Sequence, residues 1–170
     1  MTAGAAGGGF PPVPMILDLI RHGEALATQP GGTDADRPLS PPGREATAQL
    51  AARLKRERFL PSLILSSPLM RARQTAALLS EAAGTDFGIA PELVPDAAPA
   101  DIVAALAKRG VRDGHVVLVT HLPLVRHLAC HLIGRDQLFP DGTLVRIEFT
   151  GGLEPGAGRV MRVLRPGHLG

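Results

Sequence analysis

Aromatic side chains are scarce in this sequence of 170 residues: tryptophan and tyrosine are absent, and the five aromatics are all phenylalanine. Because 45% of the residues are nevertheless apolar, the core has to consist mainly of Leu, Val, Ile and Ala. That composition suits helices packed on a sheet. Residues 1–12, rich in Ala and Gly, show no apolar period and predict a flexible leader. The remaining length suits one domain, which we place at residues 13–170.

Cysteine and lysine are also rare. The only cysteine, Cys130, cannot form a disulfide within the chain, which suits a protein of a reducing compartment. Its apolar sequence neighbours predict that its side chain is buried. Lys55 and Lys108 are the only lysines, the arginines are dispersed, and the formal net charge is only +2, which argues against a nucleic-acid partner. No apolar run approaches the roughly 18 residues of a membrane span, and the N-terminus lacks a basic signal region. We expect a cytoplasmic protein with neither nucleic-acid nor membrane partners.

Apolar runs and turn residues predict alternating strands and helices. Three short apolar runs predict parallel central strands: residues 15–20, 63–65 and 115–120. Helical patterns with recognisable ends, the first capped by Ser40, lie at residues 41 to about 58, 68–83, 101–109 and 124–133. Alternation over 145–149 and 160–164 predicts an antiparallel hairpin at one edge. The sequence therefore predicts a three-layer α/β/α sandwich with a mostly parallel sheet.

Basic or polar residues follow each of the three predicted central strands. Arg21 and His22 follow the first strand, residues 66–71 follow the second, and His121 follows the third. In open α/β sheets, ligands bind beyond the carboxyl ends of the strands, so these side chains are expected to converge. The planar fork of arginine matches phosphate oxygens and stays charged at physiological pH. The sequence thus predicts a site for a phosphoryl group.

These strand ends resemble three motifs of the histidine phosphatases and cofactor-dependent phosphoglycerate mutases. Leu-Ile-Arg-His-Gly-Glu at 19–24 resembles the Arg-His-Gly signature, residues 67–75 resemble the second motif, and residues 120–125 resemble the third. The three occur in the family's order and span most of the domain. Arg-Pro-Leu-Ser at 37–40 and Pro-Glu-Leu at 91–93 resemble the short SixA-type branch of phosphohistidine phosphatases.

The resemblance implies a phosphoglycerate mutase-like fold and two displacement steps without metal ion or organic cofactor. His22 attacks phosphorus, and water then hydrolyses the phosphohistidine that forms. His121 donates a hydrogen bond where charge builds up. The non-bridging oxygens are held by Arg21, Arg37 and Arg71. Positive neighbours oppose protonation of an imidazole, so we expect a neutral His22.

Two carboxylates and two further histidines lie near these motifs. Glu92 is a possible general acid by motif order, although the activated P–N bond of a phosphohistidine needs less help from an acid. Glu24 would repel phosphate beside the nucleophile, which favours a structural salt bridge. His127 and His131 are spaced for one helix face but lack a third ligand, so no metal site is expected.

Three functions remain open at this point. The interval between Arg71 and His121 leaves no room for a large lid, which favours phosphohistidine on a protein of the histidine phosphotransfer type. A small-molecule phosphomonoesterase of the same superfamily is the first alternative. A non-catalytic module that binds phosphorylated proteins is the second, and the complete set of arginines and histidines counts against it.

Overall fold

The computed structural model describes residues 13–167, so the predicted leader lies outside the described residues. The elements, in chain order, are β1 (Met15–Arg21), η1 (Asp34–Asp36), α1 (Pro41–Arg56), β2 (Leu63–Ser66), α2 (Met70–Ala83), β3 (Phe87–Ile89), α3 (Pro99–Lys108), β4 (Gly114–Thr120), α4 (Leu124–Ile133), β5 (Leu144–Phe149) and β6 (Arg159–Leu164). No helix in this described range combines the length and apolar character needed to cross a membrane.

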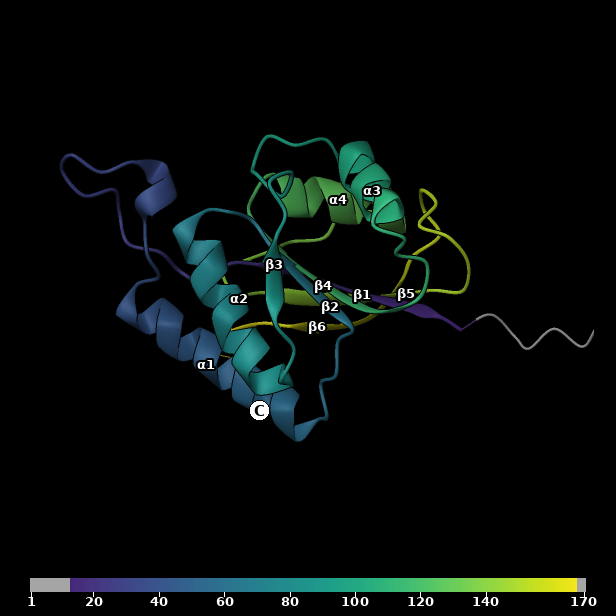
Figure 1. Ribbon diagram of the computed structural model, residues 1–170, viewed down its shortest axis with the longest axis horizontal. Helices are drawn as coiled ribbons and strands as arrows, with labels where there is room; N and C mark the ends of the chain where they lie inside the picture. Colours follow the sequence, from purple (N-terminus) through teal and green to yellow (C-terminus); the bar gives the residue numbers. More distant parts are fainter. Residues whose placement is uncertain (1–12, 168–170) are drawn as a thin grey trace, which may run out of the picture.

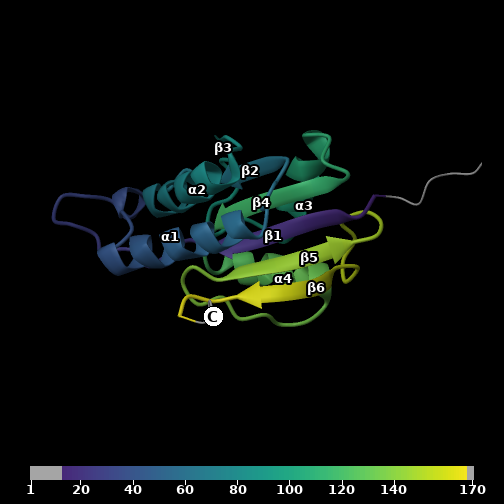
Figure 2. The same ribbon diagram turned by 90° about the horizontal axis from the view of Figure 1, so that it is seen from below.

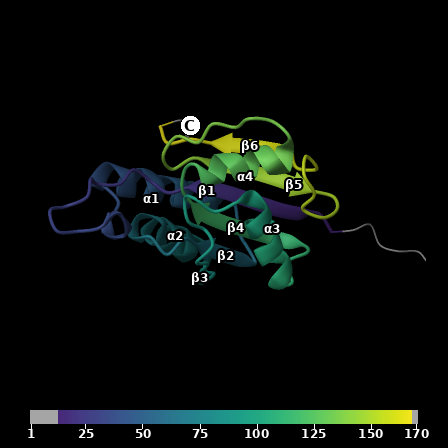
Figure 3. The ribbon, with the colours of Figure 1, turned by 90° about the horizontal axis from the view of Figure 1, so that it is seen from above.

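One six-stranded sheet, in the order β3-β2-β4-β1-β5-β6, forms the middle layer. The first four of these strands pair in parallel, whereas β5 runs antiparallel to both β1 and β6. Helices α1 and α2 cover one face of the sheet and α3 and α4 cover the other (Figure 1). Figure 2 shows the α1 and α2 side, and Figure 3 shows the α3 and α4 side. The predicted three-layer sandwich with an antiparallel edge is confirmed.

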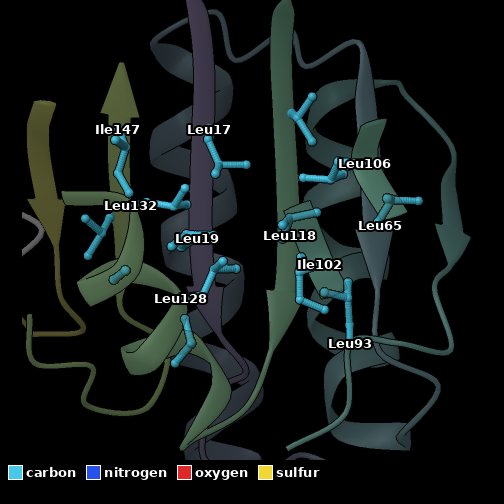
Figure 4. Close-up of a cluster of buried hydrophobic side chains, with 14 of the residues drawn as sticks. Leu17, Leu19, Leu65, Leu93, Ile102, Leu106, Leu118, Leu128, Leu132 and Ile147 are labelled. Atoms are coloured by element: carbon cyan, nitrogen blue, oxygen red, sulfur yellow. The ribbon is translucent and has the colours of Figure 1, made fainter. Parts of the chain in front are cut away.

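Alternating residues of the central strands supply two separate apolar cores. Leu17 and Leu19 of β1 pack with Leu118 of β4 and Leu128 of α4 on one face (Figure 4). The intervening residues of the same strands, such as Ile20, pack against α1 and α2 on the opposite face. Successive strand side chains point to opposite faces, so each strand is anchored on both sides. Each fully buried side chain of this kind contributes roughly 1.5–3 kcal/mol.

Helix α1 begins as predicted. The Ser40 hydroxyl accepts a hydrogen bond from the amide of Gly43 (3.0 Å), and Pro41 occupies the first helical position, where its missing N–H costs nothing. The helix ends at Arg56 instead of near residue 58, because Arg58 takes a left-handed conformation with φ 57°.

Other element boundaries differ from the predicted ones. Strand β3 was missed, because three residues with Gly88 at their centre show no strand period. Helix α2 starts at Met70 instead of 68, because an extended turn precedes it, in which the Ser67 hydroxyl accepts a hydrogen bond from the Leu69 amide (3.3 Å). Helix α3 starts at Pro99, earlier than predicted, since proline fits the first turn of a helix.

The prediction that Cys130 is buried is wrong, since its side chain is exposed. The buried face of α4 consists of Leu124, Val125, Leu128, Ala129 and Leu132. Each helical residue is rotated about 100° from the one before it, which places the residue after Ala129 outside this stripe.

A buried ion-pair cluster joins the neighbouring strands β4, β1 and β5 on the side of α1 and α2. Asp18 of β1, with no exposed surface, accepts hydrogen bonds from Arg146 Nε (2.8 Å) and Nη2 (2.7 Å) and from His115 Nε2 (2.7 Å). Arg146 of β5 lies directly opposite Asp18 in the ladder. Burial alone would raise the pKa of Asp18, but the hydrogen bonds from Arg146 and His115 outweigh it and hold the pKa below its usual value.

Removing this carboxylate should be costly for stability. Asp18→Ala should lower the free energy of unfolding by roughly 3 kcal/mol, because it leaves the Arg146 charge largely buried and unpaired. Urea unfolding of the variant and the wild type measures the difference. Asp136→Ala is the matched control, because it also removes a carboxylate held by two hydrogen bonds from one arginine, Arg126, but at an exposed position. Equal losses for the two variants would contradict a special role for the buried pair.

Candidate active site

The strand register brings the predicted site residues to one edge of the sheet. Backbone hydrogen bonds continue the parallel ladders past the strand ends: the His22 amide donates to the Thr120 carbonyl (3.0 Å), and the Ser67 amide donates to the Val119 carbonyl (3.0 Å). His121 follows Thr120 directly. Three chain segments, far apart in the sequence, therefore leave the sheet side by side, as the sequence predicted.

His22 is held with one ring nitrogen ready for attack. His22 follows the last residue of β1 and is only 7% exposed. Nδ1 donates a hydrogen bond to the Gly23 carbonyl (2.7 Å), so this nitrogen carries the proton and Nε2 carries the lone pair. Arg71 Nε donates to that lone pair from 3.2 Å. The ring nitrogen with an available lone pair is therefore Nε2, and a guanidinium group lies beside it.

Burial keeps His22 neutral. The pKa of His22 is lowered from 6.5 to about 4, first by burial and then by the positive charges of Arg71 and Arg21, while the Gly23 carbonyl acts in the opposite direction. The sequence predicted the neutral state but assigned it to the arginines. In the folded protein the larger cause is the loss of water around the ring.

Backbone contacts after the nucleophile fix its position relative to α2. The Gly23 amide donates to Thr75 Oγ1 (3.1 Å), and the same hydroxyl donates to the Arg71 carbonyl (2.9 Å). A Cβ atom at Gly23 would lie 2.5 Å from Thr47 Oγ1, so only glycine allows α1 to pack this closely. The loop after β1 is thereby clamped between two helices.

Glu24 has a structural role, but not through the salt bridge that the sequence predicted. Its carboxylate accepts a hydrogen bond from the Ser40 hydroxyl (2.6 Å), and its backbone carbonyl accepts one from the Ser40 amide (2.9 Å). No ion pair to Glu24 is found in the described part of the chain. A hydroxyl at the helix cap satisfies this carboxylate, so no cation is needed.

His121 lies beside His22 with one ring nitrogen unpaired. The two ring centroids are 4.9 Å apart. The Ser67 hydroxyl, which accepts from the Leu69 amide (3.3 Å), lies within hydrogen-bonding distance of His121 Nε2 (2.7 Å), and His121 Nδ1 is buried without a partner among the described residues. When the Ser67 hydroxyl donates to Nε2, the neutral ring carries its proton on Nδ1. The pKa of His121 is lowered to about 3, first by burial and then by the adjacent His22 ring and the positive charge of Arg71.

Arg71 and Arg37 are linked by a residue that sequence reasoning missed. Arg71, with a side chain only 5% exposed, donates from Nη1 to the Asp34 carbonyl (2.7 Å) and from Nη2 to its Oδ2 (2.9 Å). Arg37 donates from Nη1 to Asp34 Oδ1 (2.9 Å) and from Nε to the Leu26 carbonyl (2.7 Å). Arg37 thus reaches the site through Asp34 and not by contact with either histidine.

The two terminal nitrogens of Arg21 have partners, whereas its Nε has none among the described residues. It donates to the Phe139 carbonyl (2.9 Å) and forms an ion pair with Asp141 (2.8 Å). Its Nε is buried and has no partner. Arg21 Nε and His121 Nδ1 are the two buried nitrogens of these site residues that lack a hydrogen-bond partner in the described chain. Buried polar atoms without a partner are uncommon, so both indicate a polar ligand at the site.

Comparison with known proteins agrees with this geometry. Residues 17–94, which include His22 and Arg71, match the model of the histidine phosphatase superfamily, branch 1. The chain is 35% identical over 114 residues to an uncharacterised protein of Picosynechococcus sp., covering 64% of this chain and 67% of that protein. It is 29% identical over 122 residues to the phosphohistidine phosphatase SixA of Escherichia coli, covering 69% and 74%. A structure of the protein histidine phosphatase SixA complexed with tungstate has a TM-score of 0.78 and 26% identity, covering 92% of this chain and 100% of that chain.

The chain belongs to the histidine phosphatase superfamily. Membership makes the protein a phosphatase and confirms the resemblance, as well as the phosphoglycerate mutase-like fold, predicted from the motifs.

In this histidine phosphatase, Glu92 is not joined to the nucleophile. Its carboxylate pairs with Arg109, at the end of α3, and no ion pair or hydrogen bond of the described residues connects Glu92 with His22 or His121. Burial raises the pKa of Glu92, but the Arg109 hydrogen bond outweighs it and lowers the pKa overall. Glu92 is therefore ionised at neutral pH, which does not suit a proton donor.

The two histidines that follow the third motif, His127 and His131 of α4, lie outside the cluster. His127 is exposed and lines a hollow of about 430 Å³ beside Leu122, whereas His131 lines a groove of about 800 Å³ that also contacts Met15, at the opposite edge of the sheet. Within residues 13–167, no three His, Cys, Asp or Glu side chains come together as metal ligands.

Residues missed from the sequence are Asp34, Ser67, Thr75 and Asp141, which orient or pair the predicted ones. Ser67 and Thr75 lie inside the second motif and were readable as polar positions on the same segment. Asp34 lies three residues before Arg37, a spacing from which their ion pair could have been predicted. Nothing in the sequence marks Asp141 as the partner of Arg21.

The charge state of His22 is open to direct measurement. NMR titration of isotope-labelled imidazoles should show His22 neutral down to a midpoint of about 4. Since the unfolded ring takes up its proton near 6.5, the stability gained by burying the neutral ring is complete above that pH and declines as the pH falls toward 4. The exposed His127 provides a second resonance in the same experiment. A His22 midpoint near 6.5 would contradict the burial argument.

Proposed function

We propose that this histidine phosphatase hydrolyses phosphohistidine on a protein, with a phosphohistidine at His22 as the intermediate. The observation that carries the proposal is the Nε2 lone pair of His22. The hydrogen bond from Nδ1 to the Gly23 carbonyl leaves this lone pair available to attack phosphorus, and Arg71 lies beside it. Two comparisons support the substrate class. The relative from E. coli is named a phosphohistidine phosphatase, and the similar SixA structure was determined with tungstate, an oxyanion that resembles phosphate in shape and charge.

The first step transfers the phosphoryl group to the enzyme. The Nε2 lone pair of His22 forms a bond to phosphorus, and the P–N bond of the substrate breaks with its electron pair returning to the substrate nitrogen. The phosphohistidine reacts with a proton on its other ring nitrogen, so the leaving group is a neutral imidazole. Arg71 Nε then turns its hydrogen bond from His22 to a phosphoryl oxygen. In the second step, a water oxygen attacks phosphorus, the bond to Nε2 breaks, and the lone pair of His22 is restored as phosphate leaves.

The unpartnered donors supply the stabilisation that both steps need. Arg21 Nε and His121 Nδ1 have no acceptor in this structure, whereas a phosphoryl oxygen would accept from each. A neutral His121 donates without adding a charge that would protonate or repel its neighbour His22. Because both rings are buried, these hydrogen bonds act in a region of low dielectric, where they are stronger than in water.

The surroundings of the site favour a protein as the substrate. Leu122 follows His121 and is 38% exposed, Met70 precedes Arg71 and is 36% exposed, and Leu138 precedes the Phe139 that holds Arg21 and is 57% exposed. Apolar side chains exposed around a polar centre are typical of surfaces that bind another protein.

The leaving group also favours a phosphohistidine as the substrate. A phosphate monoester releases an alkoxide, which needs a proton donor, whereas the imidazole of a phosphohistidine leaves more easily. Glu92, the proposed acid for the alternative monoesterase, is engaged by Arg109. A non-catalytic phosphoprotein-binding module has no need of the free Nε2 that His22 presents.

Substitution of the nucleophile tests the mechanism. His22→Ala should reduce metal-free phosphate release from a phosphohistidine carrier protein by roughly 1,000-fold or more, because no nitrogen remains to accept the phosphoryl group. Arg71→Ala should reduce it by about 100-fold, through loss of one charge-stabilising donor. Arg73→Ala, two positions further along α2 and exposed, should change it by less than about twofold. Wild-type turnover by His22→Ala would exclude the phosphohistidine intermediate.

Substrate preference separates the protein phosphatase from the monoesterase. The wild type should release phosphate faster from the phosphohistidine protein than from a panel of phosphate monoesters, and Glu92→Gln should leave the protein reaction unchanged. Leu122→Ser should raise KM for the protein several-fold, because it removes apolar contact area beside the site, while rates with monoesters stay constant. Leu60→Ser, at an exposed apolar position between α1 and β2, is the control. A preference for monoesters that depends on Glu92 would overturn the protein assignment.

A further inference from the structure

Asp34 accepts hydrogen bonds from the same nitrogens with which Arg71 would hold a phosphoryl group. Its backbone carbonyl and its Oδ2 accept from the two terminal nitrogens of Arg71 (2.7 and 2.9 Å), and its Oδ1 accepts from Arg37 (2.9 Å). The third nitrogen of Arg71 contacts the nucleophilic Nε2 of His22. A carboxylate that bridges two arginines beside a nucleophile imitates two oxygens of a phosphoryl group.

We propose that Asp34 is a displaceable internal anion, which occupies Arg71 and Arg37 in the resting enzyme and yields them to the incoming phosphoryl group. The inference rests on the proposed function, because it takes Arg71 to be the phosphoryl-binding arginine. Its consequence concerns affinity: each phosphate that binds has to replace contacts already made, and Asp34 competes with the phosphate product for the same two arginines.

The contrast in exposure between the partners supports displacement. The Arg71 side chain is 5% exposed and fixed in the protein, whereas the Asp34 side chain is 59% exposed. Asp34 also belongs to η1, a single short turn without a buried residue. The segment is fastened at its base, where the Leu26 amide donates to the Pro38 carbonyl (2.9 Å). The turn can therefore move away from Arg71 without disturbing the sheet or α2.

Charge excludes the competing role of a proton donor. The hydrogen bond from Arg37 is the largest effect and lowers the pKa of Asp34; burial opposes it, and the hydrogen bond from Arg71 adds to the lowering, so the pKa lies below its usual value. Asp34 is therefore a carboxylate at neutral pH and cannot donate a proton to a leaving group. Its negative charge beside His22 opposes a second anion, which weakens the binding of any ligand that does not displace it.

Calorimetric titration with inorganic phosphate tests the proposal without requiring turnover. Asp34→Asn should bind phosphate about three- to tenfold more tightly than the wild type, since it removes the competing charge of an ion pair that is partly exposed. Asp34→Ser, which cannot reach both arginines, is a second variant and should bind at least as tightly. Asp36→Asn is the matched control: it removes one charge from the same turn, but that carboxylate accepts only from Thr33 and contacts no arginine. Its phosphate affinity should stay within about twofold of the wild type.

Hydrogen exchange gives an independent measurement in the wild-type protein. The amides of Asp36 and Arg37 donate to carbonyls within the turn. Saturating phosphate should accelerate their exchange if Asp34 is displaced, and should leave it unchanged or slow it if the turn stays in place.

The outcomes separate this inference from the proposed function. Equal or weaker phosphate binding by both Asp34 variants, with phosphohistidine hydrolysis intact in the wild type, overturns the internal anion alone and makes Asp34 a residue that positions Arg71. Tighter binding by the variants, with no hydrolysis of phosphohistidine by the wild type, supports the internal anion and overturns the proposed substrate. Tighter binding by Asp36→Asn to the same extent attributes the effect to overall charge and contradicts the proposal.

Discussion

The parallel pairing of β4 with both β1 and β2 is the constraint on which the site depends. It sets Arg21 beside Thr120 and Ser66 beside Val119, so the three chain segments leave the sheet at one edge and in one direction. A shift of one residue in either ladder would turn the following side chains toward the opposite face. The apolar cores on both faces prevent such a shift, because each strand has buried side chains on both sides. The hydrophobic packing of the sheet therefore determines where His22 stands.

Burial then decides the chemistry at that edge. Two imidazoles and two arginines lie close together, and the loss of water keeps the imidazoles neutral while the arginines keep their charge. A cluster of buried positive charge needs counter-charges, and the structure places carboxylates on the outer side of both arginines. Asp141 pairs with Arg21 and Asp34 pairs with Arg71. The ion pair of Asp18 and Arg146 differs from these two pairs, because its carboxylate has no exposed surface.

The sequence was sufficient for the layers, for the parallel central strands and for the convergence of the motif residues at the strand ends, because each of these depends on local patterns. Strand period and caps define the elements, and the Arg-His-Gly signature lies at a strand end. The partners of those residues depend on contacts across the fold. The Arg109 that holds Glu92 is 17 residues away along the chain, and the Ser67 that orients His121 is 54 residues away. Cys130 was misplaced because its apolar sequence neighbours were weighed without the helical phase, which groups it with the exposed Arg126 and His127.

A phosphatase that acts on phosphohistidine has to bind a dianion firmly enough to attack it and weakly enough to release it as free phosphate. Buried arginines and unpartnered donors work toward binding, and nothing in their chemistry distinguishes the substrate phosphoryl group from the product. Under the proposed function, exposed apolar side chains next to the site residues would add affinity only for a protein substrate. Asp34, in its proposed role, would lower the affinity for substrate and product alike by the same competition. Contacts that only the substrate makes would then favour the protein over phosphate, while the internal anion would help phosphate to leave.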